Sequence, residues 1–340
     1  MEKNRVTWVD IAKYICIMCV MHSHLESATP ILKEFYFPFY LSLFFFCSGY
    51  VYRPRNDFPA FAKKKMIQLF IPWLFFSVLN ILLAQILSFH AHAPLTTELF
   101  WNFLQIRGHG DGMWFVAALF VTFFPFFFII RWYEGCTSKA KAWWVLGIAW
   151  LLSALSNAYA ARMAPNLLPW KDIALPWHLE YVFVAMFYMV LGYLFRMRLE
   201  PVFDRYHSAG IRWFLWILYL TAVKFGHRLG PLDQYVTNLL GIAAVVSLSK
   251  ILPANPMVLY IGQNTLICFG LHGKLYSLLQ AVCRKGIPSL YNGILGDALY
   301  ASLFSIALTV LISLMLIPPI WVINRWFPFV IGRFPKRKNG

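Results

Sequence analysis

Long apolar runs recur along the chain and are separated by short polar connections. Most runs are close to the 20 or so residues that an α-helix needs to cross the hydrocarbon core of a bilayer. Ten such runs cover residues 7–26, 35–52, 66–89, 113–131, 142–161, 177–195, 213–227, 234–252, 257–280 and 297–323. The pattern predicts an all-α, polytopic membrane bundle of about ten transmembrane helices.

The composition supports this fold class. The 340 residues are 60% hydrophobic and 19% aromatic, and only 13% are charged, whereas soluble domains carry about 25% charged residues. The chain shows no internal repeat, no low-complexity segment and no GxxxxGK[ST] or GxGxxG loop for a nucleotide. We therefore expect one integral membrane domain over residues 1–340, and we do not expect an ATP-driven pump.

The basic residues are distributed unevenly between the two sides of the predicted bundle. With the N-terminus in the cytoplasm, 20 of the 30 Lys and Arg residues fall on the cytoplasmic side and nine on the other, while Lys13 lies within a run. This asymmetry follows the positive-inside rule, so both termini are expected in the cytoplasm. It also accounts for the net charge of +16 without a nucleic-acid partner. As a separate expectation, we place the multi-pass protein in the plasma membrane.

The first apolar run contains charged and titratable residues. Lys13 and His24 are eleven positions apart, which on a helix leaves them roughly 20° apart around the axis and about 16 Å apart along it. Asp10 is three residues before Lys13 and can pair with it, whereas His22 falls on the opposite face. Because such side chains are costly to expose to lipid, the stripe from Lys13 to His24 is expected to face a polar cavity. The plainer reading places both histidines at the outer membrane interface.

Asp-x-x-Lys followed by His24 resembles the first-helix motif of the acyltransferase 3 family of integral membrane O-acyltransferases. Lys13 stands where many members have Arg. Four further stretches resemble family motifs in the same order, and the similarity spans nearly the whole chain. They are residues 43–50 ending in Ser-Gly-Tyr, the lysine cluster (Lys63, Lys64 and Lys65) followed by Pro72-Trp73, residues 113–119 with Trp-Phe, and residues 260–266 with His272 beyond them. The sugar O-acetylases are the most similar subgroup.

The resemblance implies transfer of an acyl group, commonly acetyl from acetyl-CoA, to a hydroxyl of a cell-surface polysaccharide or lipid-linked sugar. Such a hydroxyl needs a base, and histidine titrates in the right range, which makes His24 the candidate general base. Lys13, Lys64 and Lys65 are candidates for binding the phosphates and polar groups of acyl-CoA. Trp114 is a candidate for lining the acyl pocket.

Other polar residues of the motifs are assigned either to acceptor binding or to structure. Ser48 next to Gly49 is also what close helix packing requires, and Trp114 also suits a membrane interface. The lysine cluster is equally consistent with positive-inside topology alone. The candidates for acceptor binding or structure are Asp10, Ser48, Asn264, Thr265 and His272.

A metal site and two other functions are the alternatives to this interpretation. His90 and His92 have a spacing that can bind metal, but no carboxylates accompany them, so no metal cofactor is expected. The Lys13–His24 stripe also suits a transporter or exporter of a polysaccharide or small solute, because intramembrane charges mark transport paths too. The absence of an inverted repeat argues against transport. A non-catalytic assembly partner is the third alternative, and it requires His24 to be dispensable.

Overall fold

The computed structural model describes residues 5–54, 57–87, 93–108, 112–135, 140–163, 175–226 and 230–334. All the regular secondary structure in these residues is helical, which confirms the predicted all-α class. Seven stretches are long and apolar enough to cross a membrane, among them Trp114–Glu134 and Pro176–Tyr206. Three predicted spans correspond to helices of 17 residues: α1 (Thr7–Ser23), α11 (Ala209–Phe225) and α12 (Asp233–Ser249). The described residues therefore form a polytopic membrane bundle, and the count of ten spans stays a prediction.

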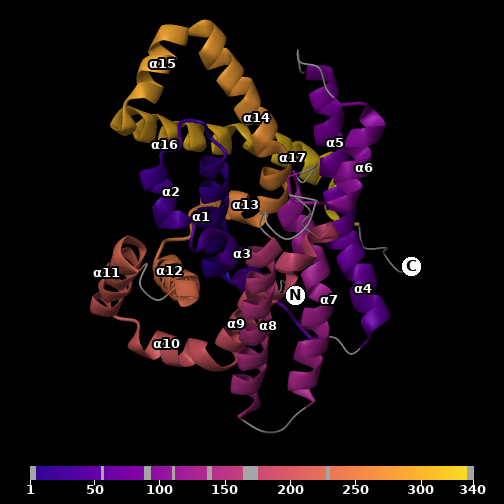
Figure 1. Cartoon of the computed structure of the whole chain (residues 1–340), viewed down its shortest axis with the longest axis vertical. Coiled ribbons are helices and arrows are strands. Elements are labelled where there is room, and N and C mark those ends of the chain that lie inside the picture. Colours follow the sequence, from indigo (N-terminus) through magenta and orange to yellow (C-terminus); the bar gives the residue numbers. More distant parts are fainter. Residues whose placement is uncertain are drawn as a thin grey trace. The chain divides into compact units, whose positions relative to one another are not determined.

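The helices form two compact units, of which unit 1 comprises Met1–Cys47 and Met197–Trp321. Helix α1 lies at its centre and packs against α12, α13 (Pro256–Gln263), α14 (Thr265–Gly286) and α16 (Ala298–Met315) (Figure 1). Ten of the 17 residues of α1 are buried, which is why this helix is apolar around most of its circumference. The shorter helices of the unit are α2 (Pro30–Tyr36), α10 (Glu200–Tyr206) and α15 (Pro288–Gly296).

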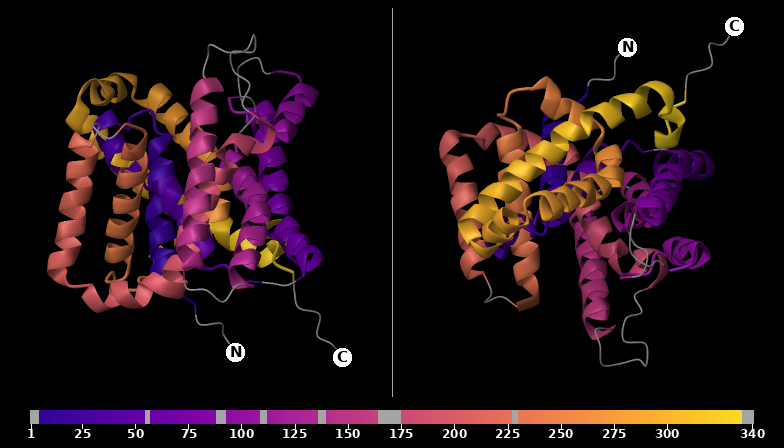
Figure 2. Two further views of the ribbon diagram at one scale, coloured as in Figure 1. Left: turned by 60° about the horizontal axis from the view of Figure 1, so that its bottom comes forward. Right: turned by 90° about the horizontal axis from the view of Figure 1, so that it is seen from above.

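The two ends of unit 1 can be told apart by the helices and polar contacts found there. At the end where α1 begins, Lys250 pairs with Glu200 of α10 at 2.7 Å and lies over the ring of Trp8. The left view of Figure 2 places α10 at this end and α15 at the opposite end. His24 follows the last turn of α1 and therefore lies toward the α15 end.

Unit 2 comprises Ser48–Arg196 and Val322–Gly340. Its long helices α7 (Trp114–Glu134), α8 (Lys141–Met163) and α9 (Leu179–Leu194) pack side by side, with α9 contacting both of the others (Figure 1). Helix α4 (Phe58–Lys65) runs through a π-helical turn, Met66–Phe70, into α5 (Ile71–Leu87), which contacts α6 (Leu95–Leu104). Two of the divisions between the units along the chain fall within helices, namely α3 (Tyr40–Tyr50) and α17 (Ile317–Trp326).

Two predicted elements differ from the observed ones. The run at 257–280 is interrupted at Asn264, whose side-chain amide donates to the Tyr260 carbonyl at 2.8 Å, because such local bonds compete with the helical ladder. The polar stretch before residue 66 is helical from Phe58, with Asp57 capping the amide of Ala60 at 3.3 Å. The lysine cluster therefore lies in the last turn of α4.

Two motif glycines allow helices to approach closely. A Cβ at Gly262 of α13 would overlap the carbonyl oxygen of Asp10 in α1, and a Cβ at Gly49 of α3 would overlap the carbonyl of Met189 in α9. Helix backbones come this close in membranes only where small residues lie at the crossing. The glycine next to Ser48 thus has the packing role that its motif predicted.

Gly262→Ala is expected to destabilise unit 1. The added methyl group meets main-chain atoms, which cannot rotate away, so the cost should reach or exceed the ~1–3 kcal/mol typical of overpacking. Thermal unfolding of the detergent-solubilised protein should show a lower Tm. Gly293→Ala in α15 is the matched control, because no atom lies within 4 Å of its Cβ position, and it should leave the Tm unchanged or slightly higher. Equal shifts in the two variants would contradict the packing argument.

Candidate functional site

A cluster of charges lies in the first turns of α1. Asp10 is only 3% exposed, with its carboxylate 2.6 Å from Nε of Arg5 and 3.0 Å from Nζ of Lys13. The predicted pairing of Asp10 with Lys13 is therefore confirmed. Two cations share one carboxylate, so the cluster keeps one surplus positive charge. Because the Lys13 side chain is 25% exposed, that charge remains accessible to an anionic group.

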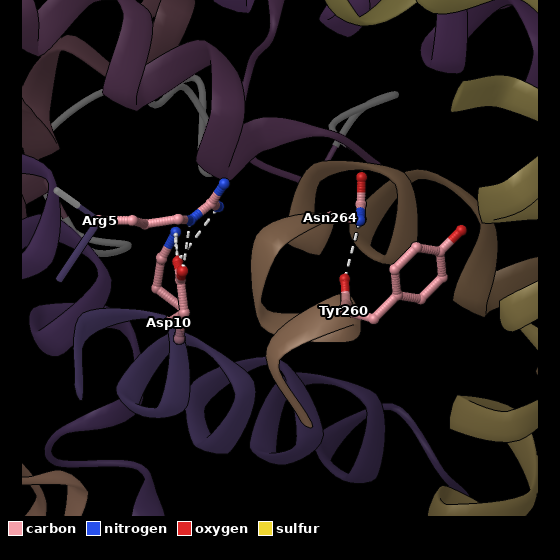
Figure 3. Close-up of polar contacts among 5 residues, drawn as sticks. Arg5, Asp10, Tyr260 and Asn264 are labelled. Carbon is pink, nitrogen blue, oxygen red and sulfur yellow. Dashed lines mark hydrogen bonds and ion pairs between the residues drawn. The ribbon is translucent and has the colours of Figure 1, made fainter. Parts of the chain in front are cut away.

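The break between α13 and α14 lies beside this cluster. Figure 3 shows Arg5, just before α1, and Asp10 of α1 next to the turn that carries Tyr260 and Asn264. Asn264 is buried and bonds to its own preceding turn, and Thr265, half-buried, begins α14. The structure thus brings Asn264 and Thr265 to the side of α1 that carries Asp10.

The two histidines at the end of α1 have different surroundings. His22 is buried, with Nδ1 2.8 Å from the Tyr36 hydroxyl and Nε2 2.9 Å from the Ser305 hydroxyl. His24 is exposed and keeps right-handed helical dihedrals as the C-cap. The eleven-residue spacing from Lys13 therefore remains on one helical stripe. Both ring nitrogens of His22 are engaged in hydrogen bonds within the bundle, whereas the His24 side chain is exposed and can be reached by a reactant.

The ring of His24 meets a second histidine. His272 of α14 lies with its ring centroid 5.1 Å from that of His24, and it is buried. Its Nδ1 is 3.1 Å from the Cys268 carbonyl and 3.0 Å from the Phe269 carbonyl. Carbonyl oxygens only accept hydrogen bonds, so Nδ1 must carry the proton and Nε2 of the neutral ring has the lone pair. His272 is therefore fixed in one tautomer beside His24.

The sequence interpretation missed the acidic residue that follows His24. Glu26 binds side chains of α14 that continue the His272 face, namely Gln280 and Arg284. The available signal was spacing, because polar residues recur every four positions after His272, which places them on one side of a helix.

Two of the three lysine candidates for donor binding, Lys64 and Lys65, belong to unit 2. Lys65 of α4 lies with Nζ 3.2 Å from the ring centroid of Phe123 in α7, a cation–π contact. Part of the Lys65 charge therefore already faces an aromatic ring. Lys64 is half-buried and Lys63 is exposed.

Trp114 and Ser48 also belong to unit 2. Trp114 begins α7 half-buried, and its ring contacts those of His178 at 5.5 Å and Tyr181 at 5.7 Å. Trp177 and His178 both have positive φ, a strained conformation for non-glycine residues that tends to occur at functional sites. Buried His178 was not singled out by its sequence context. Ser48 is half-buried beside the close contact made by Gly49.

Metal ligation finds no support in the part of the chain that the structure describes. No group of three or more His, Cys, Asp or Glu side chains there could hold a metal ion. His90 and His92 lie outside the described residues.

The arrangement in unit 1 offers a site for proton transfer at one end of α1 and a site for an anion near the other. The exposed imidazole of His24 lies at one end of α1, in contact with the buried ring of His272, whose tautomer is fixed. The surplus positive charge of the Asp10 cluster lies near the other end. A positioned imidazole can remove a proton from a hydroxyl as that hydroxyl attacks a carbonyl. The charge near Lys13 can stabilise a phosphate or another polar anion.

The comparisons with known proteins agree with this chemistry. The family model for the acyltransferase 3 family, described as an acyltransferase domain, matches residues 6–325. Neither the curated proteins nor the solved structures include a match to the chain. Since the family model covers nearly the whole sequence, the chain belongs to the acyltransferase 3 family of membrane acyltransferases.

Proposed function

We propose that this acyltransferase transfers the acetyl group of acetyl-CoA to a hydroxyl of a cell-surface polysaccharide or lipid-linked sugar, in the plasma membrane. The proposal narrows the activity of the family, which is generally O-acylation. One observation carries it: His24 is exposed at the end of an otherwise largely buried helix, with its ring against His272. The resemblance to sugar O-acetylases supports the choice of acetyl and of a glycan.

In the proposed reaction His24 is the general base. Its unprotonated ring nitrogen takes the proton from the sugar hydroxyl while the oxygen attacks the thioester carbon, and a tetrahedral oxyanion forms. Collapse breaks the carbon–sulfur bond and forms the ester. The proton on His24 then passes to the departing thiolate, which leaves as the free thiol of CoA. Atoms and charges balance without a metal or a redox cofactor.

Lys13 is proposed to bind the donor. The Lys13–His24 stripe runs about 16 Å along α1, so an extended acyl-pantetheine arm can follow it from the charged cluster toward the base. Lys64 and Lys65 are proposed to add affinity for the CoA phosphates, and Trp114 to contact the acyl group. For the acceptor we propose contacts with Thr265 and His272, and a structural role for Asp10, Asn264 and Ser48.

Neutralising Lys64 and Lys65 together is expected to raise the donor KM more than it lowers kcat. Lysines that bind phosphates equally in the ground and transition states contribute uniform binding, which acts on KM. Steady-state kinetics of the Lys64→Gln/Lys65→Gln double variant in liposomes would measure this. Lys141→Gln, which removes a cation at the start of α8, should leave the donor KM unchanged. If the double variant folds and its donor KM is also unchanged, the lysine cluster serves topology only.

A deletion strain tests the proposed function in the cell. Mass spectrometry of its surface glycans should show the loss of one acetyl increment on a defined sugar, restored by the wild-type chain and not by His24→Ala. A glycan that is normally acetylated but no longer reaches the surface would instead support the transporter alternative. Family membership already favours the enzyme, and no feature of the described residues specifically favours transport.

A further inference from the structure

The connection that follows α1 is tied to one face of α14. Three side chains of α14 at four-residue spacing, Tyr276, Gln280 and Arg284, continue the face that His272 begins. All three bind a single residue, Glu26, two positions after His24. We call these four α14 residues the α14 stripe.

Glu26 is held through both its main chain and its carboxylate. Its backbone N–H donates to the Tyr276 hydroxyl at 2.7 Å. One carboxylate oxygen accepts from Arg284 at 2.6 Å, and the other accepts from Gln280 and from the Tyr291 hydroxyl, the latter at 3.1 Å. Burial, together with the neighbouring carboxylate, raises the pKa of Tyr291 to about 12, so its hydroxyl keeps the proton that it donates. Glu26 therefore joins the end of α1 to both α14 and α15.

These contacts add little to the stability of the fold. The side chains of Glu26 and Arg284 are 36% and 56% exposed, and exposed ion pairs typically contribute about 0–1 kcal/mol. What the contacts fix is position. Regular helix ends at Ser23, and the chain then continues through turns closed by the amides of Leu25 and Ala28. The ladder of α1 alone therefore does not set where the His24 ring lies relative to His272.

We propose that Glu26 is a positioning residue that holds His24 against His272 in its productive orientation. The inference rests on the proposed role of His24 as general base. Glu26 itself touches no reacting atom. Its carboxylate binds the segment after α1 to the α14 stripe, and His272 of the same stripe contacts the His24 ring. A small misplacement of a catalytic group lowers the rate steeply, because the reacting atoms must be held close and aligned.

The test uses Glu26→Ala in the full-length protein in liposomes. The variant should fold with a Tm near that of the wild type, and kcat should fall about 10–100-fold with little change in either KM. Hydrogen exchange of the residue 26 amide should become faster, since that amide loses its fixed place on Tyr276. Glu26→Gln, which keeps the shape and an acceptor oxygen, should restore most of the lost kcat. Glu34→Ala, which removes an exposed carboxylate from α2, is the matched control and should change neither quantity.

A double variant separates this inference from the proposed function. If Glu26 acts through His24, Glu26→Ala should lower the residual rate no further in the His24→Ala background. An unchanged kcat in folded Glu26→Ala, or the same fold reduction with and without His24, would overturn the positioning role. Full activity of His24→Ala would instead overturn the proposed base. A fall in kcat explained entirely by a loss of folded protein would also overturn the positioning role.

Discussion

His24→Ala is expected to insert and fold normally but to lose about 10²–10⁴-fold in acyl transfer, the usual contribution of a positioned general base. Folding should survive because the His24 side chain is exposed and its described contact is with one ring, that of His272. The rate should be measured per folded protein, in liposomes, from release of the CoA thiol in the presence of acceptor.

His22→Ala is the matched control for this result, since it removes an imidazole from the same end of α1. It should retain most of the turnover per folded protein and should lower the Tm, because Tyr36 and Ser305 lose their shared partner. Near-normal turnover in both variants would show that His24 is not the general base. Inactivity confined to His22→Ala would show that the two histidines have been assigned the wrong roles.

Lys13→Met has the second largest expected effect. Removing the surplus charge from the Asp10 cluster should lower kcat/KM for the donor about 10–100-fold, since a hydrogen bond to a charged group contributes about 1.5–3 kcal/mol. The fold should tolerate the change, because Asp10 keeps Arg5 at 2.6 Å. Lys13→Arg, which retains the charge, should recover most of the activity. Donor-concentration series for the three proteins provide the measurement.

A different outcome would assign Lys13 to structure. If Lys13 serves only to neutralise Asp10, then Lys13→Met should lower the Tm and leave kcat/KM for the donor unchanged. Loss of acceptor affinity with normal donor kinetics would place the charge at the sugar instead.

The length of the apolar runs was enough to predict the fold class. Runs near 20 residues correctly indicated a helical membrane bundle, since the cost of exposing polar main chain to lipid leaves few alternatives. Breaks and short helices were not predictable in this way. The interruption at Asn264 involves a local bond from its side chain to the Tyr260 carbonyl. The helical conformation of the lysine cluster depends on the cap at Asp57 and on continuity with α5.

In the site, helical periodicity worked within one helix and failed between helices. The spacing of Lys13 and His24 and the pairing of Asp10 with Lys13 follow from the geometry of α1 alone. His24 contacts His272, and Glu26 accepts a hydrogen bond from Arg284; each pair is about 250 positions apart in the chain. No single-helix pattern encodes such contacts. The close approach at Gly262 was likewise hidden, because a glycine within an apolar run has several ordinary explanations.

Acetyl transfer from acetyl-CoA to a glycan, with His24 as the general base, is the proposed function. It is tested most directly by incubating the purified protein in liposomes with isotope-labelled acetyl-CoA and with glycan from the deletion strain. We expect labelled, alkali-labile ester on the glycan, CoA thiol released in equal amount, and loss of both with His24→Ala. Labelled ester formed equally well by folded His24→Ala, or no labelled ester from folded wild-type protein, would contradict it.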